Sequence, residues 1–286
     1  MTQSILETKN TVPSSMTQVS TIMKYTLLDY LRGRRFFIML IITAVISVLL
    51  TVLVGYYRPD AFLGSTSLAF YNSWWGTSVT FVVVLSAVFF GGDAISGEFQ
   101  NKTGYFGVPN PIRRSSIYVG KYVAAFIASA VMLGIFTVVT VGNGLYYFSS
   151  VPYQFGESFL FALLYLVAVL GVAFFFSSLF KSSSISILVT LILFLFVFTL
   201  LNTLIMALVK IEPWFLINYG AGIIGNVLSS PYPPHSITQT TTGFRGQPVT
   251  STTFSASIPE GLAIMGIYFI VTAILGLLLF ERKEFN

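Results

Sequence analysis

Asp93 and Glu98 are the residues whose types and spacing come closest to a catalytic arrangement. They stand five positions apart, which could make a carboxylate pair for general acid–base chemistry. The segment around them is basic, however, and offers no partner base. The two carboxylates are therefore better explained by a helix start or by salt bridges than by catalysis.

Other catalytic and ligand-binding signatures are missing from the sequence. No G-x-x-x-x-G-K-[ST] motif occurs, so the chain does not bind a nucleotide in that way. Cysteine is absent, which removes disulfides, thiolate zinc sites and cysteine nucleophiles. The only histidine, His235, lies in a polar loop, where a lone histidine is more often solvated than a metal ligand. We therefore expect no catalytic, cofactor-binding or metal-binding residue in this chain.

The composition indicates a protein solvated by lipid. Of 286 residues, 55% are hydrophobic and 9% are charged, and the mean hydropathy is +0.83. Because soluble domains devote about a quarter of their residues to charge, this chain has too few polar side chains to cover a soluble globule. The net charge of +5 is better explained by topology-setting Lys and Arg than by nucleic acid, and no nucleic-acid partner is expected.

Long apolar runs predict transmembrane helices. Crossing a hydrocarbon core of about 30 Å takes roughly 20 helical residues, and six runs of that kind contain no Asp, Glu, Lys, Arg or His. Ion-coupled transporters and voltage sensors need ionisable groups inside the membrane, so both classes are disfavoured. The predicted spans are 36–57, 74–92, 122–148, 159–180, 184–209 and 261–280.

The basic residues predict the orientation of these spans. With the N-terminus inside, 12 of the 15 Lys and Arg residues lie on the cytoplasmic side, and only Arg58, Lys210 and Arg245 lie outside. We predict a multi-pass protein of the cell membrane with both termini in the cytoplasm. An aromatic belt at the outer interface is expected from Tyr56, Tyr57, Trp74, Trp75, Tyr146, Tyr147, Tyr153 and Trp214.

The segment before the first span is predicted to contain an interfacial amphipathic helix. Residues 1–16 are expected to be a disordered leader and residues 17–35 the helix. Leu28 falls on the polar side and weakens the pattern. The alternative is a plain polar leader whose basic cluster, Arg32, Arg34 and Arg35, only anchors the first span. The apolar stripe consists of Val19, Ile22, Met23, Leu27 and Tyr30.

The segment 210–260 is predicted to be an extracytoplasmic loop. Within it, residues 213–228 are apolar, but they are short and contain glycine and asparagine. We interpret them as an interfacial or re-entrant helix, with a seventh span as the alternative. Residues 229–257 are rich in Ser, Thr and Pro and should form an exposed loop, which could serve as a lid, a docking surface or a filler.

Mildly polar side chains inside the spans admit two roles. Ser, Thr and Asn commonly support helix packing through hydrogen bonds, and they could also line a weakly polar pathway for an amphipathic substrate. These residues are Thr43, Ser47, Thr51, Thr77, Ser78, Thr80, Asn143, Thr199, Asn202 and Thr203.

The cytoplasmic loop 93–121 contains a recognisable pattern. It is predicted to form a short helix, a turn at Pro109 and Pro111, and a basic helix start. The sequence GDAISGEF at 92–99 is followed by PIRR at 111–114 and IYVGKY at 117–122. This order resembles the permeases of the ABC type-2 family, the membrane subunits of ATP-binding-cassette exporters, over most of residues 17–286. Gln100 replaces the family's second acidic residue, and Lys102-Thr103-Gly104 replaces its Gly-Thr pair.

The resemblance implies a fold, partners and a function. The fold is an all-α polytopic membrane protein with six transmembrane helices, an N-terminal interfacial amphipathic helix and a short cytoplasmic coupling helix, residues 36–286 being the permease domain. Two such chains, or this one and a homologue, would pair through their first and fifth spans. They would rest on two copies of an ABC ATPase, which binds ATP and Mg²⁺, so this chain needs no cofactor of its own. The pore would export an amphipathic or hydrophobic substrate such as a drug, lipid or peptide.

The resemblance also implies roles for charged residues. The coupling helix would dock into the ATPase, with Glu98 making a polar contact, and basic residues would anchor helix ends at the inner lipid surface. The coupling residues would be Asp93, Ser96, Gly97, Glu98, Phe99 and Lys102. The anchors would be Arg34, Arg35, Arg113, Arg114 and Lys121.

Two other functions compete with export. A membrane scaffold or assembly subunit could use a partner ATPase for another purpose, and would show no substrate-dependent stimulation of ATP hydrolysis. An intramembrane enzyme, such as a lipid-modifying transferase, should carry charged or histidine residues near a membrane face, which the spans lack.

Overall fold

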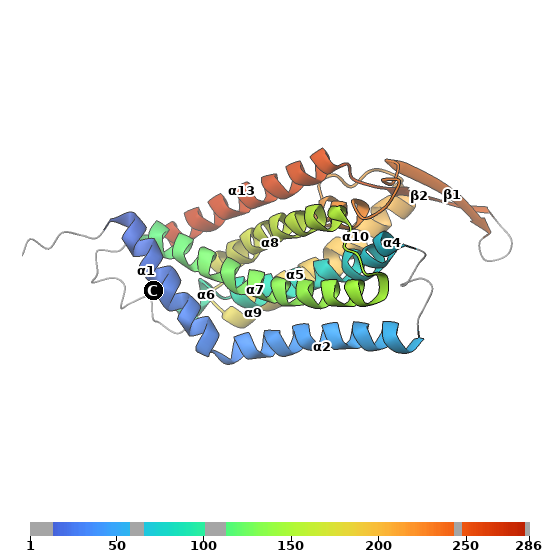
Figure 1. The fold of residues 1–286 in the computed structure, drawn as a ribbon. Helices are drawn as coiled ribbons and strands as arrows, with labels where there is room; N and C mark the ends of the chain where they lie inside the picture. Colours follow the sequence, from blue (N-terminus) through green and yellow to red (C-terminus); the bar gives the residue numbers. More distant parts are fainter. Residues whose placement is uncertain (1–13, 58–65, 101–112, 243–247, 284–286) are drawn as a thin grey trace, which may run out of the picture.

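The chain folds into a bundle of long helices lying roughly side by side, with a two-stranded hairpin at one end (Figure 1). The computed structural model describes residues 14–57, 66–100, 113–242 and 248–283. Within them, six helical segments are long and apolar enough to cross a membrane, which confirms the predicted six-span, helical membrane protein. These segments are Arg34–Tyr56, Ser67–Gln100, Arg114–Phe148, Tyr153–Leu179, Ser183–Val209 and Ile258–Arg282.

Several of these segments are composite, because π-helical stretches interrupt the α-helices. In chain order the elements are α1 (Ser15–Arg32), α2 (Arg34–Tyr57), α4 (Ser67–Tyr71), π-helix η1 (Asn72–Gly76), α5 (Thr77–Gly91), α6 (Ser96–Gln100), α7 (Arg114–Phe148), α8 (Tyr153–Leu179), α9 (Ser183–Ile192), π-helix η3 (Leu193–Val197), α10 (Phe198–Leu204), π-helix η4 (Ile205–Val209), α11 (Ile217–Ala221), α12 (Ile223–Asn226), β1 (Ser236–Thr242), β2 (Pro248–Phe254) and α13 (Ile258–Arg282). We call the end of the bundle that carries α6 the junction end and the opposite end the hairpin end.

The second, third and fourth spanning segments begin six to eight residues before their predicted spans. The second segment starts at Ser67, where the Thr66 hydroxyl accepts a hydrogen bond from the N–H of Ala69 at 3.2 Å and caps the helix. α7 starts at Arg114 and α8 at Tyr153, although Lys121 and Glu157 interrupt their apolar runs. A charged residue interrupts the apolar run from which a span is predicted, but the α-helix itself continues through that residue.

Helix α1 lies where an amphipathic helix was predicted at 17–35, but it begins at Ser15 and ends at Arg32, so that Arg34 and Arg35 belong to α2. The Ser14 hydroxyl caps it by accepting from the Thr17 N–H at 3.3 Å, and it ends at Gly33, where the extended backbone turns into α2. Its apolar stripe faces α7, where a Cβ at Gly120 would lie 2.9 Å from Ile22. The location of α1 at a membrane surface stays a prediction.

Residues 213–228 do not form a single helix. They fold into the two short helices α11 and α12, which meet at Gly222 and bury Ile217, Tyr219 and Ile223. Glycine allows this close packing, since a Cβ at Gly220 would lie 3.0 Å from Ile264 of α13. Within the described ranges, the segment is therefore a broken helix packed into the bundle and not a seventh span. Non-helical backbone at membrane depth is tolerated where protein surrounds it.

The predicted exposed loop at 229–257 contains a β-hairpin. β1 and β2 pair antiparallel, with Ser236 opposite Phe254 and Thr242 opposite Pro248. The strands are rich in threonine, a β-branched residue that favours extended backbone. Apolar periodicity could not reveal them, because their alternation involves few apolar side chains.

The predicted aromatic belt divides into two groups. Tyr56, Tyr146 and Tyr153 are about four-fifths exposed, as a lipid-facing belt requires. Trp74 and Trp75 are instead fully buried, so their place in the belt was wrong. The Trp75 ring stacks on the Phe136 ring, with 5.7 Å between the ring centroids, and the Trp75 Nε1–H donates to the Ser158 hydroxyl at 2.9 Å. The two tryptophans belong to the core.

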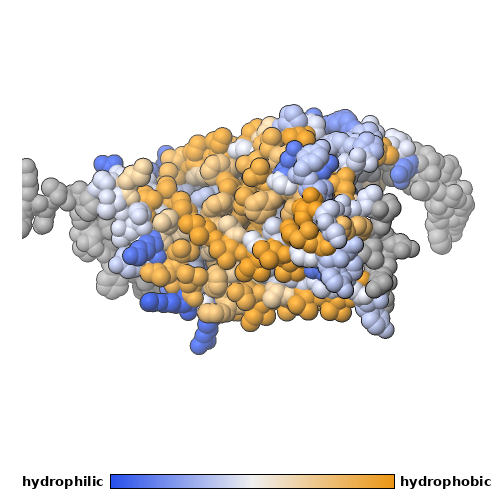
Figure 2. All heavy atoms as spheres, in the orientation of Figure 1, coloured by the Kyte–Doolittle hydropathy of each residue, from blue (hydrophilic) through white to orange (hydrophobic). Residues whose placement is uncertain are grey.

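The face of the bundle seen in Figure 2 carries a broad apolar band, with hydrophilic residues gathered towards both ends. The second spanning segment is central and has 78% of its apolar window buried. The first, fifth and sixth have only 22%, 17% and 17% buried. Lipid or another chain must cover these three helices, because so large an apolar surface is unfavourable in water.

Candidate functional site

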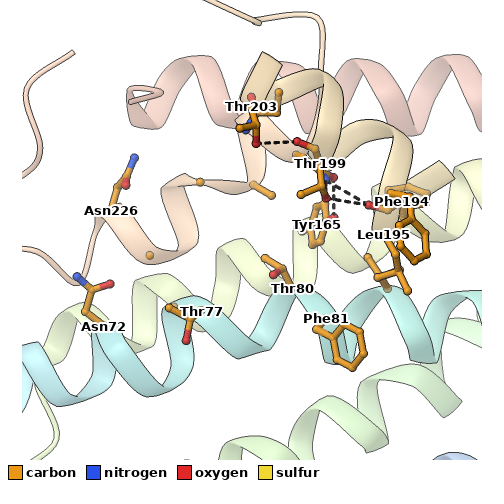
Figure 3. Close-up of a pocket in the computed structure, with 18 of the residues that line it drawn as sticks. Asn72, Thr77, Thr80, Phe81, Tyr165, Phe194, Leu195, Thr199, Thr203 and Asn226 are labelled. Carbon is orange, nitrogen blue, oxygen red and sulfur yellow. Dashed lines mark hydrogen bonds between the residues drawn. The ribbon is translucent and has the colours of Figure 1, made fainter. Parts of the chain in front are cut away.

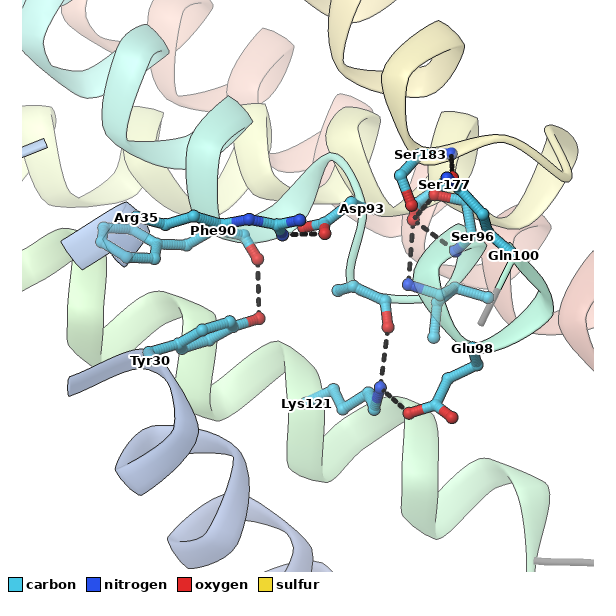
Figure 4. A network of polar contacts seen from close by, with 12 residues as sticks. Tyr30, Arg35, Phe90, Asp93, Ser96, Glu98, Gln100, Lys121, Ser177 and Ser183 are labelled. Atoms are coloured by element: carbon cyan, nitrogen blue, oxygen red, sulfur yellow. Dashed lines mark hydrogen bonds and ion pairs between the residues drawn. The ribbon is translucent and has the colours of Figure 1, made fainter. Parts of the chain in front are cut away.

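The junction end is organised around α6, a five-residue helix that follows the turn after α5. The Ser177 hydroxyl of α8 accepts hydrogen bonds from the backbone N–H groups of Ile95 and Ser96 at 2.9 and 3.0 Å (Figure 4). A helix start leaves N–H groups without intrahelical partners. Here a side chain from another helix satisfies them, which fixes α6 to α8.

The other end of α6 is attached to α9. The Gln100 amide oxygen accepts a hydrogen bond from the backbone N–H of Ser183, the first residue of α9, at 2.7 Å. Gln100 is the position at which this chain departs from the acidic residue of the resembled pattern. The Gln100 side-chain oxygen is therefore hydrogen-bonded to another helix of the same chain.

Two ion pairs hold the turn and α6 to neighbouring helices. Arg35 of α2 pairs with Asp93, whose side chain is 8% exposed. Lys121 of α7 pairs with Glu98 and also donates to the Ala94 carbonyl oxygen at 2.8 Å (Figure 4). The first and third spans therefore both contact the segment that joins α5 to α6.

A polar cleft of about 590 Å³ separates this segment from α1. Its lining includes Asp29, Arg34 and Gly97 as well as the two ion pairs. The Tyr30 hydroxyl donates to the Phe90 carbonyl oxygen at 2.7 Å and closes one side. Burial raises the pKa of the Tyr30 phenol above its ordinary value, so the phenol stays a neutral donor.

The Phe99 side chain of α6 packs against the C-terminal end of α13. The Lys283 ammonium is 4.3 Å from the centre of the Phe99 ring, and the Phe280 ring meets Phe99 edge-on at 6.4 Å. Lys283 also donates to the carbonyl oxygens of Ser178 and Phe180 at the end of α8, at 2.9 and 2.8 Å. Burial and the nearby Lys181 lower the pKa of Lys283 to about 8.

The predicted anchors make contacts inside the chain. Arg114 donates to the carbonyl oxygens of Glu281 and Lys283 at 2.8 and 2.9 Å and so caps the end of α13. The Arg113 backbone N–H donates to the buried Gln18 side chain at 3.2 Å, which fixes α1 to the start of α7. Lys102 lies outside the described residues.

A second site, an uncharged pocket of about 710 Å³, lies among η1 and α5, η3 and α10, and α11 and α12 (Figure 3). It combines amide and hydroxyl side chains with aromatic and aliphatic ones, and no Asp, Glu, Lys or Arg is among its described lining residues. The polar members are Asn72, Thr77, Thr80, Tyr165, Thr199, Asn202, Thr203, Asn218, Asn226 and Ser229.

Asn218 joins three sides of this pocket. Its amide nitrogen lies 3.4 Å from both the Phe194 carbonyl oxygen and the Thr199 hydroxyl, and its oxygen accepts from the Tyr165 hydroxyl at 3.3 Å. Asn202 keeps a buried side-chain oxygen that accepts no hydrogen bond in the described structure. The pocket thus offers neutral acceptors and donors beside an apolar wall, which suits a ligand with a neutral polar group and an apolar body.

Half of the ten polar residues predicted inside the spans line this pocket, and the others do not. Thr77, Thr80, Thr199, Asn202 and Thr203 line the pocket. Outside the pocket, the Asn143 amide of α7 donates to the Thr51 hydroxyl of α2 at 3.1 Å and joins these two helices. Ser78 of α5 is half-buried and is not among the pocket's lining residues. Thr43 and Ser47 each donate to the carbonyl four residues earlier in their own helix. The Asn72 amide donates a hydrogen bond to the Ser229 hydroxyl at 2.8 Å. These two pocket residues were not predicted from the sequence, because they lie outside the predicted spans.

Comparison with known proteins gives one family match. The family model described as ABC-2 family transporter protein matches residues 20–285. No curated protein matches the chain.

Proposed function

The chain belongs to the ABC-2 transporter family and is thus a permease subunit of an ABC transporter, and from this premise we propose that it exports an amphipathic substrate. ATP hydrolysis takes place in a partner ABC ATPase, which binds ATP and Mg²⁺. Two copies of this ATPase serve a pair of permease chains. Both termini and the junction end face the cytoplasm, in agreement with the distribution of Lys and Arg.

The attachment of α6 on several sides is the observation that carries this proposal. α6 and the preceding turn contact α2 through Asp93, α7 through Glu98, and α8 through Ser96. A displacement of α6 by an ATPase would therefore move several spans together, because packed helices shift as rigid bodies. The cleft beside α6 offers both signs of charge to a docking partner.

The uncharged pocket supports the amphipathic substrate class. Its amides and hydroxyls suit a neutral polar group, and Phe81, Phe194 and Leu195 suit an apolar body. A strongly charged substrate would find no counter-ion among the described lining residues.

The weak burial of the first and fifth spans supports pairing with a second permease chain. Apolar residues such as Ile41 and Val48 of α2 and Leu188 and Leu200 of the fifth span are 58–61% exposed. A second copy or a homologue placed against these helices would cover them.

Purification from the native membrane in mild detergent tests the proposal. We expect an ATPase with a Walker A motif to co-purify, and its activity in lipid to rise with an amphipathic compound. A chain that purifies alone would contradict the ATP-driven mechanism. An associated ATPase with no response to any amphipathic compound, and no transport, would instead favour the scaffold function.

A further inference from the structure

Three possible metal ligands meet at the hairpin end, although they are 23 and 25 residues apart in the sequence. Glu212 follows η4, His235 precedes β1, and Glu260 lies in the first turn of α13. One ligand atom from each lies within 4.8 Å of the other two, and His235 Nε2 is 3.3 Å from Glu212 Oε2. Ligands bound tetrahedrally at about 2.0–2.1 Å are themselves roughly 3.3 Å apart, so small side-chain rotations would close the site.

Hydrogen bonds from neighbouring groups hold both carboxylates. The Tyr219 hydroxyl donates to Glu212 Oε1 at 2.6 Å, which leaves Oε2 facing the imidazole. The backbone N–H of Ser257 donates to Glu260 Oε2 at 2.9 Å. Outer hydrogen bonds of this kind orient the ligands of metal sites.

The charges of the three groups also favour a cation. The Glu212 side chain is 24% exposed, and its ion-pair partner in the described structure is His235, which is charged only when protonated. In the part of the chain that the structure describes, neither Glu212 nor Glu260 pairs with a lysine or arginine. Two neighbouring carboxylates without a lysine or arginine beside them repel each other whenever the imidazole is neutral, and a divalent cation would remove that repulsion.

We propose that Glu212, His235 and Glu260 bind a divalent transition metal of the zinc class. One imidazole and two carboxylates are ligands that Zn²⁺ accepts, and three protein ligands leave a position for water. An imidazole is a poor ligand for Mg²⁺ or Ca²⁺, which prefer oxygen. The proposal departs from our expectation that this chain holds no metal ligand, although the His235 side chain is 54% exposed, as a solvated histidine would be. It does not depend on the proposed export function.

Metal binding would fix the hairpin end of the pocket. The three ligands belong to the loop after η4, the start of the hairpin and the start of α13, so the ion would join these elements. Through Tyr219 it would also restrain α11, whose Asn218 and Ala221 line the pocket. The expected effect is a less mobile α11 and a more stable loop.

Zinc titration of the full chain tests this site. The chain has one histidine and no cysteine, so background binding is low once any histidine tag is removed. The purified chain is treated with EDTA and titrated with Zn²⁺ against a chromogenic chelator. Co²⁺ is added separately for its visible absorption spectrum. The variants are His235→Ala, Glu212→Gln and Tyr219→Phe, and the matched control is Glu157→Gln, an exposed glutamate at the same end of the bundle.

We expect about one Zn²⁺ per chain, an intense tetrahedral Co²⁺ band, and loss of both in the His235 and Glu212 variants. Tyr219→Phe should weaken binding about tenfold, whereas Glu157→Gln should bind as the wild type does. Absence of binding by the wild type, or equal binding by all variants, would overturn the proposal. If a ligand variant fails to fold, the cobalt spectrum of the wild type and the zinc affinity of Tyr219→Phe still show whether the three residues bind a metal ion.

Discussion

The Ser177 hydroxyl of α8 accepts a hydrogen bond from the backbone N–H of Ser96, the first residue of α6, at 3.0 Å. Ser177 is fully buried, so water cannot replace this contact. The start of the proposed coupling helix is therefore fixed by a residue 81 positions further along the chain.

Ser177→Ala should weaken the coupling of ATP hydrolysis to transport. The change leaves two buried N–H groups without a partner, which costs about 1–3 kcal/mol and releases α6 from α8. Thermal unfolding and the ratio of transport to ATP hydrolysis measure the two effects. Ser178→Ala is the control, because the buried Ser178 hydroxyl makes no hydrogen bond in the described structure. Equal behaviour of the two variants would contradict the role of Ser177.

Glu98→Arg should uncouple ATP hydrolysis from transport, because it places two cations together at the Lys121 contact. Adding Lys121→Glu restores an ion pair with the charges exchanged, and we expect the double variant to recover much of the coupling. Transport per ATP hydrolysed is the measurement, with Lys24→Glu, an exposed residue of α1, as control. If the double variant stays uncoupled, Glu98 acts on the ATPase and not through Lys121.

Thr199→Val should lower the response to substrate. It keeps the side-chain shape and removes the hydroxyl that faces Asn218 in the pocket. Loss of one neutral hydrogen bond of about 0.5–1.5 kcal/mol should raise the half-maximal concentration for ATPase stimulation several-fold. Thr137→Val in α7 makes the same chemical change outside the pocket lining. A comparable shift in that control would show that the effect is general.

The stability of the wild type should rise between about pH 8 and pH 10.5 through Lys283. The pKa of Lys283 is about 8 in the folded chain, against an ordinary value of 10.5 for a lysine. The unfolded state therefore binds more protons across this window, and stability increases with pH. Lys283→Met should lose this rise in a thermal unfolding series. Lys181→Met should move it to higher pH, because Lys181 helps to lower the pKa of Lys283. A wild-type rise that Lys283→Met leaves unchanged would assign it to another group.

Gly144→Ala should destabilise the bundle. An added Cβ would overlap the hydroxyl oxygen of the buried Tyr71, so the Tyr71 ring or the helices α7 and α4 would have to move. Overpacking of this kind costs about 1–3 kcal/mol. Gly142→Ala, two residues away with open space at its Cβ, should leave the melting temperature unchanged or raise it. Similar melting temperatures for both variants would contradict the predicted clash.

The sequence by itself determined the class of this protein. Six apolar runs without charge can satisfy their backbone in lipid only as helices, so the number of spans followed from hydropathy. The pattern around Glu98 predicted the family that the match over residues 20–285 confirms. The apolar stripe that includes Ile22 and Tyr30 predicted a helix where α1 lies. These features depend on local periodicity and local charge, which one sequence displays directly.

The tertiary structure decided which distant residues meet. Charge count and aromatic type could not separate Trp75, which is buried, from Tyr146, which is exposed, because burial depends on packing against other helices. Asn202 and Asn218 share a pocket only because α11 returns into the bundle. Glu212, His235 and Glu260 converge for the same reason: the chain reverses at the hairpin and at the start of α13, and no local pattern encodes a contact across more than 20 residues.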